Sequence, residues 1–253
     1  MRKIFGIARY TFIEIFRNKV WYVLILFSAI LIVSTLLLGT LGGEQKDRLI
    51  LDLGLATIEM IAFLSTVFAA VNLVLAEMES RTLYLILTRP VARVIFIVGR
   101  FLGLIAIMTC AFLLMSAAHI GLLTYIHAAP DRHYFLSLLF SWEKIVVITA
   151  VALVFSLFST SAASALTFTF FFWIMGHFST EILYLARKAS RPFLIFLCKT
   201  FYYIFPNFQS MNIRDIPPEI TNPRWLWAAG GYGLSYTCVC LLFTALLFRK
   251  KEF

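Results

Sequence analysis

The sequence predicts an all-α integral membrane protein with six transmembrane helices, and three observations support this prediction. Hydrophobic residues make up 61% of the 253 residues and charged residues only 14%, whereas soluble proteins average about 45–50% and about 25%. Several apolar runs reach the roughly 20 residues that a helix needs to cross a bilayer. Basic residues are concentrated in three segments. This composition excludes a soluble domain, a disordered chain, a disulfide scaffold and a nucleic-acid-binding domain, although the net charge is +9.

The apolar runs give the predicted spans in chain order. Residues 20–41 form an uncharged first span, and residues 56–76 form a second with only Glu59 near one end. Residues 94–126 form a third span that is longer than one crossing requires, so its first turns are expected outside the hydrocarbon.

The last three spans depend on how one long apolar run is divided. Residues 145–178 form a run of 34 without Lys, Arg, Asp or Glu, which is too long for a single crossing. A cluster of small polar residues at 159–164 predicts a tight turn in its middle. We therefore predict a fourth span at 142–159, a fifth at 163–180 and a last span at 225–248.

The distribution of charge supports an even number of spans with both termini on the same side. With six spans, the chain ends and the link between the second and third spans share one face. These segments hold 12 of the 22 basic residues and 4 of the 13 acidic residues. Because basic residues collect on the cytoplasmic side, both termini are predicted to be cytoplasmic.

The segments outside the spans have their own patterns. Residues 1–19 predict an amphipathic elbow helix in the cytoplasmic interface, with Phe5, Phe12 and Phe16 on its apolar face. A basic start that only sets the topology remains the alternative. The longest outer segment, 181–224, contains a short apolar stretch between two prolines that predicts an interfacial or re-entrant helix.

Residues 77–93 link the second and third spans on the cytoplasmic side. The residue before Pro90 is disfavoured in a helix, so a short helix is expected to end near Thr88. Its apolar centre, residues 83–87, is flanked by charged residues. This pattern is suited to docking in a groove of a cytosolic partner, and an ordinary short loop is the alternative.

The run from Glu79 to Gly103 reads E-S-R-T-L-Y-L-I-L-T-R-P-V-A-R-V-I-F-I-V-G-R-F-L-G. It resembles the pattern E-x-x-T-L/I…L-x-x-P-V/I-S/A-R…G-K-F-L-G of permease subunits of ABC-2-type transporters, in particular the branch named after the copper-enzyme maturation permease NosY. The resemblance implies that this link is a coupling helix that seats on an ATPase subunit. The residues that match the motif by position are Glu79, Thr82, Leu83, Pro90, Arg93 and Gly99. Arg81 and Arg100 depart from it, because many relatives have Gly and Lys there.

The resemblance also assigns roles within the link. The predicted ATPase-coupling residues are Glu79, Arg81, Thr82, Leu83, Leu87, Pro90 and Arg93. In this interpretation, Arg81 and Arg93 form charge pairs with the ATPase, and Leu83 and Leu87 fill its groove.

The chain has no G-x-x-x-x-G-K-[ST] motif, so it is not predicted to be an enzyme or to hold a cofactor of its own. The resemblance places ATP and Mg on two cytosolic ATPase subunits. It also implies a second permease chain, identical or related, an external accessory protein as a further possible partner, export as the direction, and the cytoplasmic (inner) membrane of a prokaryote as the location. The alternative function is a mechanical transmitter or assembly factor that passes ATPase motion to an external partner without moving a solute.

Polar residues inside predicted spans are costly and therefore candidates for function. Glu59, Glu143, Lys144 and Glu181 map near the outer interface, where we expect them to reach water. His119 and His177 suggest a b-type haem as a remote alternative, but their predicted depths in the membrane differ.

Overall fold

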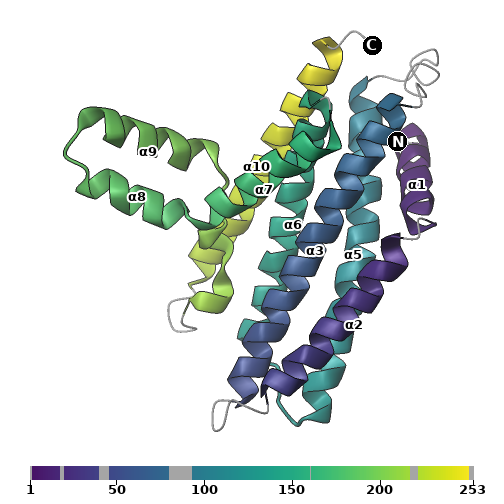
Figure 1. Cartoon of the computed structure of the whole chain (residues 1–253), viewed down its shortest axis with the longest axis vertical. Helices are drawn as coiled ribbons and strands as arrows, with labels where there is room; N and C mark the ends of the chain where they lie inside the picture. The colour runs from purple at the N-terminus through teal and green to yellow at the C-terminus, as the bar shows by residue number, and fades with distance from the viewer. Residues whose placement is uncertain are drawn as a thin grey trace.

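The computed structural model describes residues 2–17, 20–39, 46–79, 93–159, 161–216 and 222–250, and no strand occurs among them. Long helices run side by side in a bundle, with the two chain ends at the same end of it (Figure 1). Within the described residues, four helices are long and apolar enough to cross a membrane: α3 (Lys46–Glu79), α5 (Arg93–Tyr125), α6 (Arg132–Phe158) and α10 (Pro223–Lys250). The chain is therefore a helical, multi-pass membrane protein.

A fifth candidate span is a bent pair of helices. α7 (Ala162–His177) and α8 (Ser179–Lys188) meet at an angle of 63°. The break between α6 and α7 falls in the small polar cluster where the sequence predicts a turn. α2 (Val20–Gly39) coincides with the predicted first span and has 20 residues without a charge. The count of six spans remains a prediction.

Two helices begin well before their predicted spans. α3 begins at Lys46 and α6 at Arg132, so residues 46–55 and 132–141, which lie outside the predicted spans, are helical. Ile50 and Leu55 explain the extension of α3, because both are buried in the core. Asp131 caps α6 by accepting a hydrogen bond from the Tyr134 backbone N–H at 2.8 Å. Because α3 has 34 residues, it is about 51 Å long and exceeds the roughly 30 Å hydrocarbon core.

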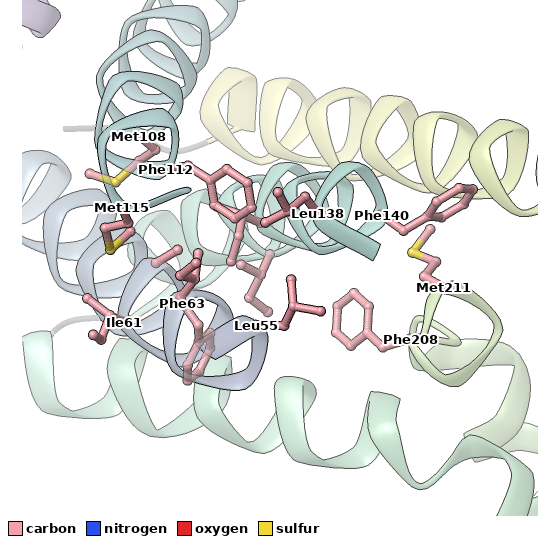
Figure 2. Packing of buried hydrophobic residues seen from close by; sticks show 14 of the residues in the cluster. Leu55, Ile61, Phe63, Met108, Phe112, Met115, Leu138, Phe140, Phe208 and Met211 are labelled. Atoms are coloured by element: carbon pink, nitrogen blue, oxygen red, sulfur yellow. The ribbon is translucent and has the colours of Figure 1, made fainter. Parts of the chain in front are cut away.

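The core lies between α3, α5, α6 and α7 (Figure 2). The ring of Phe63 on α3 stacks on Trp173 of α7, with 4.2 Å between centroids. Trp173 also contacts Phe208, at 5.0 Å between centroids. Phe208 precedes two short 3-10 helices, η2 (Gln209–Met211) and η3 (Ile213–Asp215), and is fully buried. Part of the segment 181–224, expected to be wholly external or interfacial, thus returns into the bundle because its large apolar side chains complete the core.

The remainder of that segment forms a helical hairpin. α9 (Pro192–Ile204) runs back along α8, and the pair projects sideways from the bundle (Figure 1). α9 coincides with the short apolar stretch between Pro192 and Pro206 in which the sequence predicts a helix. Its position in the membrane interface remains a prediction.

Candidate functional site

The N-terminal helix α1 (Arg2–Phe16) packs against the first turns of α5. A Cβ atom at Gly99 would lie 2.8 Å from the Ile7 Cβ, and one at Gly103 would lie 2.5 Å from the Thr11 Cβ. Real Cβ atoms do not approach other heavy atoms this closely. The two helices can therefore touch only because both α5 positions are glycine.

Arg100, between these glycines, fixes α1 by polar contacts. Its side chain is 6% exposed and its Nη1 donates to Glu14 Oε2 at 2.8 Å and to Thr11 Oγ1 at 3.0 Å. The guanidinium also lies 5.4 Å from the ring centroids of Tyr10 and Phe96. We call Gly99, Arg100 and Gly103, with their α1 partners, the elbow seat.

The elbow seat gives the G-R-F-L-G end of the motif a structural role that the sequence interpretation missed. Arg100 counted there as one of the positive charges on the cytoplasmic side and as a departure from the motif. Two signals could have found the contact: a pair of glycines on one helical face beside an arginine, and Glu14 as the only acid in an otherwise basic first segment. An i, i+4 glycine pair creates a flat surface on which another helix can pack closely.

Of the predicted coupling residues, Glu79 and Arg93 lie in the described part of the chain. Glu79 is the last residue of α3 and Arg93 the first of α5, at the end of the bundle where the termini lie (Figure 1). Arg81, Thr82, Leu83, Leu87 and Pro90 lie outside the described residues. Arg93 precedes Arg100 by about two helical turns. A force on the link would therefore act on α3, α5 and, through the elbow seat, α1.

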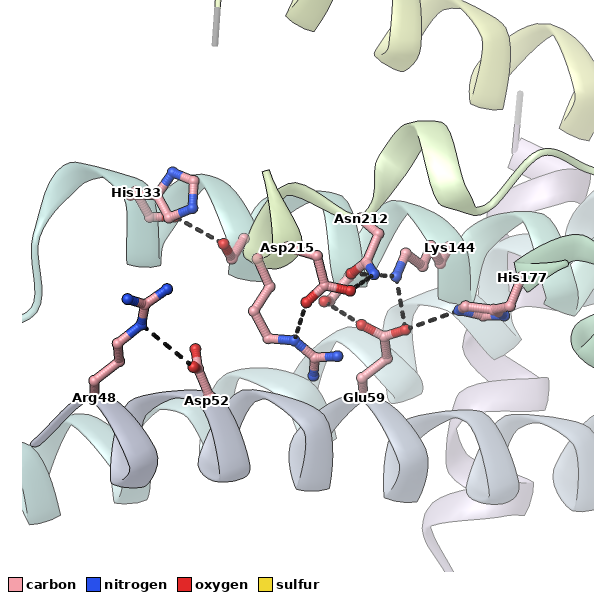
Figure 3. A network of polar contacts seen from close by, with 11 residues as sticks. Arg48, Asp52, Glu59, His133, Lys144, His177, Asn212 and Asp215 are labelled. Atoms are coloured by element: carbon pink, nitrogen blue, oxygen red, sulfur yellow. Dashed lines mark hydrogen bonds and ion pairs between the residues drawn. The ribbon is translucent and has the colours of Figure 1, made fainter. Parts of the chain in front are cut away.

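A second polar cluster, which we call the outer network, joins α3, α6 and α7 (Figure 3). Lys144 Nζ on α6 donates to Glu59 Oε1 on α3 at 2.8 Å. Ser141 donates to Glu59 Oε2 at 2.6 Å, and His177 Nε2 on α7 lies 3.5 Å from Oε1. The Lys144 side chain is 1% exposed and that of Glu59 is 12% exposed. The pair is thus removed from solvent almost completely.

The outer network extends to the returning segment. Lys144 Nζ lies 3.5 Å from Asn212 Oδ1, and the Asn212 amide donates to Asp215. These contacts tie η3 to α3, α6 and α7 (Figure 3). A buried charge is costly unless it is paired and hydrogen-bonded, so the contacts of Glu59 and Lys144 hold four chain segments in one arrangement.

The expectation that the acidic and basic residues near the outer interface reach water is wrong for Lys144 and Glu143, and the Glu59 carboxylate is bound by protein groups instead. Glu143 is 8% exposed and faces α10, where a Cβ at Gly233 would lie 2.5 Å from its Oε1. Within the described part of the chain, that oxygen has no hydrogen-bond partner. Glu181 is exposed, as expected. Hydropathy indicates the position of each residue along its helix, but not which helix faces meet.

A pocket of about 820 Å³ lies beside the outer network, at the end of the bundle away from the termini. The beginning of α3, the turn before α6 and η3 line it. Its lining residues with charged or imidazole side chains are Arg48, Asp52, Asp131, His133, Arg214 and Asp215. Arg48 pairs with Asp52 at 3.9 Å, and Arg214 with Asp215 at 3.2 Å. Both signs of charge are present, so the pocket is suited to water and polar groups.

The two candidate haem ligands are engaged by the protein. His119 is fully buried, its Nδ1 lies 2.8 Å from the Tyr134 hydroxyl, and its ring packs on the α3 backbone at Gly54. His177 Nδ1 lies 2.9 Å from the Trp173 carbonyl oxygen, and its Nε2 faces Glu59. The environments of His119 and His177 do not fit two ligands of a shared haem. Among the described residues, no group of three His, Cys, Asp or Glu could hold a metal ion.

The fold and these two clusters define a helical multi-pass membrane protein with a packed N-terminal helix and a buried charge network. No protein-family model matches the chain, and no curated protein matches it.

Proposed function

We propose that this chain is the membrane-spanning permease subunit of an ABC-2-type transporter, an exporter driven by separate cytosolic ATPase subunits. The run from Glu79 to Gly103 carries the proposal, because it resembles the coupling motif of such permeases at six positions. The placement of that run supports it. Its first residue, Glu79, is the last residue of α3, and its last residues form the elbow seat that contacts α1.

The mechanism follows from the lengths of the two helices that the link joins. α3 has 34 residues and α5 has 33, so each can carry a displacement at the link across the whole bilayer. Glu59 lies 20 residues before Glu79, a helical distance of about 30 Å. ATP-driven closure of the ATPases would push the link, tilt α3 and α5, and bear on the outer network through Glu59. Transport would then follow at the interface with a second permease chain.

The second candidate function is a mechanical transmitter that acts on an external partner without moving a solute. The observation that favours it is the extension of α3 and α6 beyond their predicted spans, where they line the polar pocket. Purified complexes in vesicles distinguish the two functions. ATP-dependent movement of a solute indicates transport, and ATP-dependent binding of an external protein without solute movement indicates transmission.

The primary experiment is a pull-down of the tagged chain from detergent-solubilised membranes of its native host, with identification of the co-purifying proteins. We expect a stoichiometric ATP-binding subunit. Its retention should fall in Arg93→Glu and be lost in the Leu83→Asp/Leu87→Asp variant. Arg132→Glu is the matched control, because this exposed arginine begins α6 at the opposite end of the bundle.

Two results would contradict the proposal. Recovery of the wild-type chain without an ATP-binding subunit would exclude the permease assignment. Unchanged retention in both link variants, with normal membrane insertion, would exclude a docking role for residues 80–93.

A further inference from the structure

The α8–α9 hairpin leaves the bundle at the bend that ends α7. α7 begins in the half of the bundle where the termini lie (Figure 1). It has 16 residues, a length of about 24 Å. The chain then bends by 63° into α8, so α8 does not continue the direction of α7. The hairpin projects sideways from this point (Figure 1).

The hairpin exposes much more apolar surface than a segment in water would. None of the residues of α9, all of which the structure describes, is buried. The exposed fractions of Phe193, Phe196 and Tyr203 are 75%, 68% and 80%. On α8, Tyr184 and Leu185 are also exposed. Aromatic residues on an amphipathic helix are typical of the membrane interface, where apolar rings and polar groups are both accommodated.

Positive charge is concentrated at the tip of the hairpin, the end farthest from the bundle (Figure 1). Arg187 and Lys188 end α8, Arg191 lies in the turn before α9, and all three are exposed. Glu181 is the only acid between residues 179 and 204, and it lies in the first turn of α8. Long basic side chains at such a position can place their apolar stems among lipid tails and their charges among phosphates.

We infer that the α8–α9 hairpin is a lipid-binding arm, and that Arg187, Lys188 and Arg191 bind the headgroups of anionic phospholipids. The exposed rings would anchor the arm at the interface, and the basic tip would select negatively charged lipid. A second copy of this chain fits the tip less well, because it would bring the same three positive charges to the contact.

Native mass spectrometry of the full chain, purified in detergent, tests this inference. The protein is mixed with equal amounts of phosphatidylglycerol and phosphatidylcholine. We expect the wild type to retain several-fold more phosphatidylglycerol and the Arg187→Gln/Arg191→Gln variant to retain the two lipids about equally. Arg132→Gln/Arg224→Gln is the matched control, because it removes two exposed arginines outside the hairpin and should keep the preference.

Equal retention of the two lipids by the wild type, or an unchanged preference in Arg187→Gln/Arg191→Gln, would overturn the inference. A cross-linking measurement tests the alternative that a second copy of the chain binds the tip. Arg191→Cys is made in a chain whose four native cysteines are changed to serine, and disulfide formation between two copies at the tip would assign the tip to a protein interface. Because no ATPase takes part, failure of either test leaves the proposed function unaffected.

Discussion

The elbow seat and the outer network both join segments that are far apart in the sequence, but they do so by different physical means. Arg100 and Glu14 are 86 residues apart, and Lys144 and Glu59 are 85 residues apart. Both pairs have a separation of 2.8 Å. Glu14 is 37% exposed, whereas neither member of the outer pair exceeds 12%.

This difference in exposure predicts which feature stabilises each region. Water screens the acid of the elbow seat, so the ion pair contributes little and backbone contact through Gly99 and Gly103 is the main constraint. The charges of the outer network have lost their hydration, so each depends on its partner. The elbow seat should therefore tolerate loss of charge but not added volume. The outer network should not tolerate loss of one charge.

The largest effect is expected for Lys144→Met. This change leaves Glu59 buried without its cation, and breaking a buried pair in this way costs about 3–5 kcal/mol. The free energy of unfolding in mixed micelles, from a titration with sodium dodecyl sulfate, measures the loss. The double variant Glu59→Met/Lys144→Met should recover most of it, because no unpaired charge remains. A single-variant loss below about 1 kcal/mol would show that water reaches Glu59.

A smaller effect is expected for Gly103→Leu in the elbow seat. The new side chain would overlap Thr11 and the Ala8 carbonyl, and overpacking of this kind costs about 1–3 kcal/mol. Amide hydrogen exchange should become faster in α1 and stay unchanged in α6. Gly121→Leu is the control on the same helix, because no atom lies within 4 Å of its Cβ position. Normal protection of α1 in Gly103→Leu would contradict the close contact.

The smallest effect is expected for Glu14→Gln, which keeps the shape of the side chain and removes its charge. We expect a loss of about 1 kcal/mol or less, because the carboxylate is partly solvated. Thr11 and the rings of Tyr10 and Phe96 still surround the guanidinium. The same detergent titration measures this value. A loss as large as that of Lys144→Met would mean that charge, and not close packing, holds α1 in place.

Much of the helical framework was predictable because hydropathy is a local property. The break between α6 and α7 and the helix between Pro192 and Pro206 occur where the sequence indicates them. The early beginnings of α3 and α6 were missed, because polar residues such as Asp47 and Arg132 resemble a loop when their packing is unknown. The return of residues 205–216 into the core was missed for the same reason.

The sequence by itself determined that this is a helical membrane protein, because long uncharged apolar runs can satisfy their backbone groups in a bilayer only by forming helices. The tertiary structure alone decided that Arg100 pairs with Glu14, that Lys144 pairs with Glu59 and that α1 packs against Gly103. Each of these contacts depends on which faces of two distant helices meet. The periodicity of a helix shows which residues share its face, but it does not show which partner that face will contact.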